Sequence, residues 1–187
     1  EMIDFAKYAF NKSHAAAYAV VSYQTAWLKY YFPVEYMAAL MTSVIDNPSK
    51  VSEYIYACRQ MNTKILPPDI NKGEANFSVD GGDIRYGLAA IKSIGRPVIK
   101  AIVEDREELG LFQNLEDFIT RLSAKNILNK RTIENLIKAG ALDTLGGTRK
   151  QFMSIYVQIV DHVTQEKKNS MVGQMTLFDL VSEDQKE

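Results

Sequence analysis

The 187-residue sequence is poor in cysteine, in histidine and in net charge. Cys58 is the one cysteine, so no internal disulfide can form, and a reducing cytoplasm fits this usage. His14 and His162 lie far apart and have no zinc-like spacing with Cys58. Lys and Arg total 22 against 23 Asp and Glu, so any nucleic-acid binding must come from local patches of charge. No apolar run approaches the roughly 20 residues of a membrane helix, and we expect no membrane partner.

The sequence also lacks the motifs of several enzyme classes. It has no glycine-rich phosphate loop and no Gly-x-Ser-x-Gly elbow, and the absence of a nucleophile–base pair argues against a small hydrolase. Phosphoryl transfer with two metal ions needs carboxylates that hold the ions close together. Asp80 and Asp83 flank a glycine turn and are predicted to be turn residues, whereas Glu104–Asp105 is predicted to lie on a solvated helix face. We therefore expect no catalytic residue, metal site or cofactor in this segment.

Hydrophobic spacing, together with proline and asparagine at helix starts, predicts a mostly α protein. The predicted helices cover residues 1–9, 13–31, 33–45 and 48–61. Further helices are predicted after Asn114 as a cap, over residues 132–139 with Gly140 closing, and from the cap Thr148 to about residue 167. The first is apolar on most sides, which is typical of a buried helix, and its candidate core residues are Val20, Val21, Trp27 and Leu28. Two short apolar runs around Gly81 and Gly82 predict a β-hairpin, and the polar end of the chain after Lys167 is predicted to be disordered.

A more specific signal lies in residues 10–42, which read FNKSHAAAYAVVSYQTAWLKYYFPVEYMAALMT. A polar, cationic cluster precedes a long apolar helix, and the positive end of a helix dipole favours an anion such as phosphate. An ordinary capped core helix would explain the cluster by itself. The whole stretch, however, closely resembles the fingers region of the alpha subunits of bacterial DNA polymerase III. The resemblance continues through residues 65–71, ILPPDIN, and on to the tail.

This resemblance implies a fragment of a replicative DNA polymerase from a bacterial cytoplasm. Asn11, Lys12, Ser13 and His14 would lie near the incoming deoxynucleoside triphosphate, with Lys12 offering a point charge to a phosphate. The family often has glycine where this chain has Ala9. The metal-binding aspartates of the family belong to the palm, and none of them matches this chain. Nucleotidyl transfer and its Mg²⁺ are therefore expected in the parent protein, and the fragment alone is expected to be inactive.

Two turns in the second half resemble the hairpins of helix-hairpin-helix motifs, although each could also be a plain helical turn. At such a turn, backbone N–H groups at the start of the second helix meet a phosphate of duplex DNA without reading bases. In the first turn, Ser93 stands where the motif usually has glycine, and the second turn is more degenerate. The candidate DNA-binding residues are Ile94, Gly95, Arg96 and Lys100 in the first copy and Asn129, Lys130 and Arg131 in the second.

The tail carries Gln174-Met175-Thr176-Leu177-Phe178, which resembles the motif by which bacterial proteins bind the sliding clamp. Leu177 and Phe178 would fill a hydrophobic pocket of the clamp, and Gln174 would form a hydrogen bond at its rim. Met175 lies between these anchors. The alternative is a last turn of the chain that folds back onto its own domain.

These features divide the sequence into three parts. Residues 1–75 are predicted to be the C-terminal part of helical fingers, and residues 76–167 a β-hairpin with a tandem helix-hairpin-helix domain. Residues 168–187 are predicted to be a flexible tail with the clamp-binding motif. The predicted function is to contact the incoming nucleotide, hold duplex DNA and tether a polymerase to its sliding clamp. The alternative function is that of a non-enzymatic helical adaptor that binds DNA independently of a polymerase.

Overall fold

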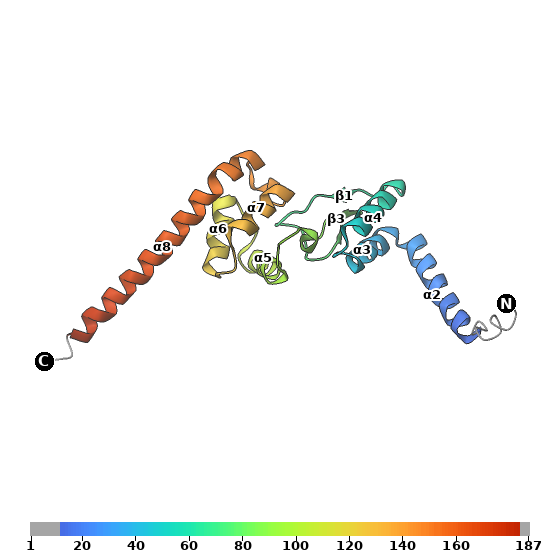
Figure 1. The fold of residues 1–187 in the computed structure, drawn as a ribbon, viewed down its shortest axis with the longest axis horizontal. Helices are drawn as coiled ribbons and strands as arrows, with labels where there is room; N and C mark the ends of the chain where they lie inside the picture. The colour runs from blue at the N-terminus through green and yellow to red at the C-terminus, as the bar shows by residue number, and fades with distance from the viewer. Residues whose placement is uncertain (1–11, 184–187) are drawn as a thin grey trace, which may run out of the picture.

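The described part of the computed structural model, residues 12–183, is elongated and mostly helical (Figure 1). Helix α2 (Lys12–Tyr31) and helix α8 (Arg149–Glu183) project from opposite ends of a central body, and side chains are described as far as residue 169. None of the described helices is long and apolar enough to cross a membrane. The mostly α fold with a small sheet that the sequence predicts is confirmed. The helix predicted over residues 1–9 lies outside the part that the structure describes.

One end of the central body is a small core built from two helices and a sheet. Helix α3 (Pro33–Ser43) and helix α4 (Pro48–Gln60) each begin on a proline, whose missing N–H would have no intrahelical partner in the first turn. The Asn47 side chain caps α4 by accepting a hydrogen bond from the Lys50 N–H at 3.2 Å. The buried residues of this core are Met37, Ala38, Met41, Ile45, Val51, Cys58, Phe77 and Ile84.

The sheet has three short strands in the order β1-β3-β2. Strand β1 (Ile65–Leu66) pairs in parallel with β3 (Asp83–Arg85), which pairs antiparallel with β2 (Ser78–Asp80). Gly81 and Gly82 turn the chain between β2 and β3 at φ angles of +61° and +89°, which glycine adopts without strain. The predicted hairpin is therefore confirmed. Strand β1 is an addition, because two residues are too few to produce an alternating pattern.

Asp80 and Asp83 flank the turn between β2 and β3, as predicted, and both form hydrogen bonds within or next to the sheet. Arg85 donates hydrogen bonds to Asp80 at 3.1 Å and 2.5 Å, and this guanidinium lowers the pKa of the Asp80 carboxyl below its usual value. Asp83 accepts a hydrogen bond from the Lys64 N–H at 2.9 Å. Within the described residues, no group of three or more His, Cys, Asp or Glu side chains could hold a metal ion.

The other end of the central body is a helical core that contains both predicted hairpins. It is formed by the 3₁₀ turns η1 (Leu88–Ala90) and η2 (Asp143–Leu145), by helices α5 (Arg96–Leu109), α6 (Leu115–Ala124) and α7 (Lys130–Ala139), and by the first half of α8. Its fully buried side chains include Ile99, Ile102, Phe118, Ile119, Leu122, Ile133 and Leu136.

The segment between the two cores belongs to both of them. Ile70 is buried in the helical core, and its N–H donates to the Ala141 carbonyl at 3.0 Å. Arg106 of α5 donates to the carbonyls of Ile70 at 2.9 Å and Gly73 at 2.6 Å. The chain then returns to the first core with Phe77 before it enters the second at η1. Because the chain crosses three times between β1 and η1, the two cores are fastened to each other.

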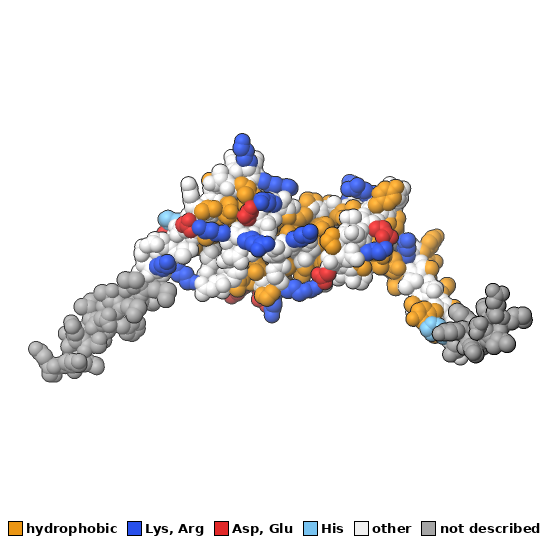
Figure 2. Space-filling view, viewed as in Figure 1, with side chains coloured by type: hydrophobic (Ala, Val, Ile, Leu, Met, Phe, Trp, Pro, Cys, Tyr) orange, Lys and Arg blue, Asp and Glu red, His pale blue; other side chains and the backbone are white. Residues whose placement is uncertain are grey.

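Helix α2 differs from the prediction, because none of its residues is buried. Val20 and Val21 are 57% and 52% exposed, and Trp27 and Leu28 are each 43% exposed. Figure 2 shows hydrophobic side chains along the surface of this helix. The helix meets α3 where the chain turns at residues 32–33, and beyond that turn no described element covers it. A helix that is apolar all round signals a packing partner, but the described residues do not supply one.

Helix α8 is longer than predicted. The sequence favours an end near Lys167, but the helix continues to Glu183. Residues 168–183 contain no proline and only one glycine, Gly173, so nothing in this stretch stops a helix. Residues 184–187 lie outside the described part, and the flexibility of residues 168–187 in solution stays a prediction.

Candidate nucleic-acid interface

The first hairpin is a turn at residues 91–96 that leads into α5. Ser93 has a φ of +64°, so it adopts the left-handed conformation that the glycine of the motif would supply. Ile94 is buried in the helical core and anchors the turn. Gly95 is the N-cap of α5 and has no side chain to cap it. Pro97 has no N–H, and the Val98 N–H donates to the Gly95 carbonyl at 3.0 Å, so within the described residues the Arg96 N–H is the open donor of the first turn. The first helix of the motif is reduced to the 3₁₀ turn η1, which the sequence did not indicate.

Cationic side chains flank this open helix start. Arg96 is the first residue of α5, is exposed and has no ion pair among the described residues. Lys100, one turn later, is 76% exposed and lies 3.5 Å from Glu104 on the same helix. Figure 2 shows Lys and Arg side chains spread over the central body between the projecting helices. Positive charge is therefore present beside this helix start, together with the Glu104 carboxylate next to Lys100.

The second hairpin, residues 123–130, has a similar turn but a different helix start. Asn126 takes the left-handed conformation, with a φ of +56°. Asn129 caps α7 by accepting a hydrogen bond from the Thr132 N–H at 2.8 Å. Lys130 pairs with Asp161 of α8 at 2.6 Å, and Arg131 is exposed. At the second hairpin, one backbone N–H of the helix start and the Lys130 ammonium group therefore already have partners within the chain.

A hydrogen bond and a shared core bring the two hairpins together. Asn135 of α7 donates to the Lys92 carbonyl of the first hairpin at 3.3 Å. Ile94 of the first turn lies in the same core cluster as Ile133 of α7, and Ile127 and Leu128 of the second turn pack against that cluster. The tandem arrangement predicted from the sequence is therefore a single packed unit.

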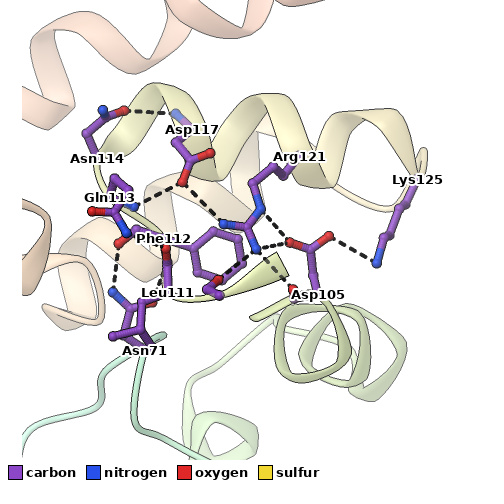
Figure 3. A network of polar contacts seen from close by, with 10 residues as sticks. Asn71, Asp105, Leu111, Phe112, Gln113, Asn114, Asp117, Arg121 and Lys125 are labelled. Carbon is purple, nitrogen blue, oxygen red and sulfur yellow. Dashed lines mark hydrogen bonds and ion pairs between the residues drawn. The ribbon is translucent and has the colours of Figure 1, made fainter. Parts of the chain in front are cut away.

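A buried ion pair joins α5 to α6 (Figure 3). Asp105 of α5 is only 1% exposed, which corrects the prediction that it lies on a solvated face. Arg121 of α6 donates to Asp105 Oδ1 at 2.7 Å and to the Gly110 carbonyl at 2.9 Å. Lys125 adds a second cation at 3.0 Å, and the Arg121 guanidinium lies 4.2 Å from the centre of the Phe112 ring. The two positive charges of Arg121 and Lys125 compensate the cost of burying the Asp105 carboxylate.

A second contact fixes the loop before α6. The Asn71 side chain donates to the Phe112 carbonyl at 2.9 Å and accepts from the Phe112 N–H at 2.9 Å (Figure 3). Asp117 Oδ2 accepts from the Gln113 N–H at 3.0 Å in the same loop. No sequence pattern predicts these pairs, because their partners lie far apart along the chain or in a loop without periodic spacing. They position the elements from which the hairpins extend.

The predicted nucleotide-proximal residues lie away from the hairpins. Lys12, Ser13 and His14 are exposed in the first turn of α2, at the end of the helix that points away from the central body (Figure 1). Asn11 lies outside the described residues. The His14 ring contacts Tyr18 with the two ring centres 4.4 Å apart. The structure therefore does not join this cluster to the hairpin surface.

The predicted clamp-binding residues all fall on α8. Gln174 and Met175 are in its helical backbone, as are Leu177 and Phe178, and their side chains lie outside the described part. The motif is thus on the helix that projects from the hairpin unit, at the end of the molecule opposite α2 (Figure 1).

Comparison with known proteins agrees with this geometry. A family model described as "Helix-hairpin-helix motif" matches residues 62–152, which include both hairpins and the segment between the two cores. DNA polymerase III subunit alpha of Mycobacterium tuberculosis (strain CDC 1551 / Oshkosh) is 44% identical over 177 residues, and that of Vibrio cholerae is 47% identical over 180 residues. The corresponding Escherichia coli (strain K12) subunit is 46% identical over 181 residues.

These matches cover nearly all of the chain but little of the relatives. They include 95–96% of this sequence, whereas the chain spans about 15% of the length of the M. tuberculosis and V. cholerae subunits. The resemblance to the alpha subunit of bacterial DNA polymerase III is therefore confirmed over almost the whole chain. The chain is homologous to one segment of the alpha subunit of bacterial DNA polymerase III and carries a helix-hairpin-helix motif.

Proposed function

We propose that this chain is the part of a replicative DNA polymerase that holds duplex DNA through the sugar–phosphate backbone, without reading base sequence. The observation that carries this proposal is the uncapped start of α5. Its N-cap is Gly95, it follows the left-handed Ser93, and Arg96 stands unpaired beside it within the described residues. The open Arg96 N–H at the helix start, next to its own guanidinium, suits a phosphate.

Replacing both Arg96 and Lys100 by alanine is expected to weaken duplex binding equally for unrelated sequences. Binding of this kind typically has a dissociation constant of ~10⁻⁴ to 10⁻⁶ M at physiological salt. Each lost phosphate contact should reduce the slope of log affinity against log salt by about 0.9. Fluorescence anisotropy over a salt series, with two duplexes of different sequence, measures both quantities.

The matched control is Lys50→Ala, which removes an exposed cation from α4 in the other core. Lys50 pairs with Glu53 at 2.8 Å, and its loss should leave duplex affinity and salt slope unchanged. If the Arg96/Lys100 double variant binds like the parent chain with the same slope, the hairpin is not the duplex-binding surface.

We also propose that α2 belongs to the fingers of the parent polymerase and packs against parts of that protein outside this chain. Two observations support this role: the apolar surface of α2 is exposed, and the chain spans only about 15% of the M. tuberculosis subunit. Lys12 and its neighbours would then face the incoming nucleotide. The Mg²⁺ ions and the transfer step belong to other domains of the parent, in the bacterial cytoplasm.

The third part of the proposal is that residues 174–178 tether the polymerase to its sliding clamp. A micromolar complex corresponds to about −8 kcal/mol, and burying one large apolar side chain contributes roughly 1.5–3 kcal/mol. Phe178→Ala should therefore weaken clamp binding by about 1.5–3 kcal/mol, and Gln174→Ala by about 0.5–1.5 kcal/mol. Titration of the clamp against the three chains measures these differences.

The thermal stability of the same variants separates the tether from a structural role. Phe178→Ala should leave the melting temperature nearly unchanged, because a clamp-binding side chain is free of the domain core. A melting temperature that falls by several degrees would place Phe178 in the core and contradict the tether.

A further inference from the structure

Helix α8 lies over the second hairpin. After anchoring in the helical core with Phe152 and Tyr156, it packs along α6 and α7 and passes the turn that joins them. Where it passes, α8 and the turn enclose a small hollow of about 180 Å³. The residues lining it are Ser123, Asn126 and Leu128 of the turn and Val160, Val163, Thr164 and Lys167 of α8.

The polar groups of the turn are bound by α8. Lys167 donates to the Asn126 side chain at 2.6 Å and lies 3.5 Å from the carbonyls of Ser123 and Ala124. These carbonyls lie at the end of α6, and that of Ser123 also accepts from the Asn126 N–H at 3.1 Å, so the ammonium group adds a further donor to the end of the helix. One side chain of α8 thus fastens the helix to the hairpin.

At the start of α7 the cation and one N–H group are also engaged. Lys130 forms an ion pair with Asp161 of α8 at 2.6 Å, and the Asn129 side chain accepts from the Thr132 N–H at 2.8 Å. A carboxylate beside Lys130 both neutralises its charge and repels an approaching phosphate. The equivalent cation of the first hairpin, Arg96, has no such partner among the described residues, and Gly95 leaves its helix uncapped.

From this contrast we infer that the second hairpin is the seat of α8 and not a phosphate site, so that the first hairpin alone carries the duplex contact. The inference rests on the proposed duplex-binding function and assigns a different role to each of the two hairpins. The first hairpin binds DNA, and the second hairpin sets the direction in which α8 leaves the helical core.

Two substitutions at equivalent positions test this division. Arg96 and Lys130 are the first residues of α5 and α7, so each presents its charge at the start of a hairpin helix. In the 187-residue chain, Arg96→Ala should weaken binding to a short duplex roughly threefold to tenfold, the share of one phosphate contact in such a complex. Lys130→Ala should leave the dissociation constant unchanged within about a factor of two.

A second pair of variants tests whether Asp161 masks Lys130. Asp161→Asn keeps the size of the side chain and removes its charge, so duplex binding should tighten, roughly twofold to threefold for one exposed charge. Adding Lys130→Ala to Asp161→Asn should cancel this gain. Circular dichroism melting of each variant confirms that the fold is retained, since both side chains are about half exposed.

Three outcomes are distinguishable. Loss of affinity on Lys130→Ala as large as that on Arg96→Ala would overturn the inference, and so would an Asp161→Asn chain that binds no more tightly. If Arg96→Ala itself changes neither affinity nor salt slope, the proposed duplex-binding function fails instead. The predicted pattern is a sensitive Arg96, a silent Lys130, and a Lys130 that becomes important once Asp161 loses its charge.

Discussion

Replacing Arg121 by alanine is expected to lower the free energy of unfolding by about 3 kcal/mol. Removing one partner of a buried ion pair typically costs 3–5 kcal/mol, because an uncompensated charge remains in the interior. The partner here is Asp105, which is 1% exposed. The loss falls at the lower end of the range because Lys125 still lies 3.0 Å from the carboxylate. Urea unfolding followed by circular dichroism measures the difference.

The matched control for this prediction is Arg149→Ala. Arg149 pairs with Asp143 at 2.6 Å, but the two side chains are 51% and 43% exposed. An exposed pair contributes at most about 1 kcal/mol, since water and salt screen the charges. Equal losses for the two variants would mean that the Asp105 pair is hydrated in solution and does not hold α5 to α6.

The second large effect is a difference in stability loss between a leucine-to-alanine substitution on α7 and the same substitution on α2. Leu136→Ala should cost about 2–5 kcal/mol, because Leu136 is fully buried in the helical core and its truncation leaves a cavity. Leu28→Ala makes the same chemical change on α2, where the side chain is 43% exposed. Its cost should stay within about 0.5 kcal/mol, the range of ordinary surface substitutions.

Both variants replace leucine by alanine inside a helix, where the two residues have similar helix propensity, so the comparison isolates burial. Differential scanning calorimetry of the two chains provides the measurement. A loss for Leu28→Ala as large as that for Leu136→Ala would show that α2 is packed in this chain by itself. Its apolar surface would then need no partner from the parent polymerase.

The sequence predicted well those features that depend on neighbouring residues. Pro33 and Pro48 start helices where predicted, and Asn114 caps α6 as predicted. Gly140 ends α7 in the left-handed conformation. Each of these signals acts through a side chain or a backbone constraint within one turn of the chain, so a linear sequence is enough to read it.

Features that depend on distant partners could not be predicted in this way. Asp105 looks like a surface residue in its own helix, but Arg121 of α6 and Lys125 at the end of α6 neutralise its charge in the interior. Asn71 pairs with a backbone 41 residues away. Lys130 looks like a phosphate ligand until Asp161 of α8 is placed beside it. Only the fold decides which charges are free.

The helix α2 illustrates the opposite error. Its apolar pattern predicts a buried helix, but none of its residues is buried by the described part of the chain. A sequence pattern indicates that a helix packs against something, and it does not say whether that partner belongs to the same segment. Ser93 is intermediate: the sequence marks it as a departure from glycine, and only its φ of +64° shows that the hairpin keeps its turn.

Amide hydrogen exchange of the 187-residue chain, with and without a saturating short duplex, tests the central claim most directly. The N–H groups of the first hairpin turn and of Arg96 at the start of α5 are the proposed phosphate ligands, so exchange should slow in residues 92–100, where Pro97 carries no amide hydrogen. The turn at residues 123–130 should exchange at the same rate in both samples. Unchanged exchange in residues 92–100, with protection confined to the second turn or to α2, would contradict this account.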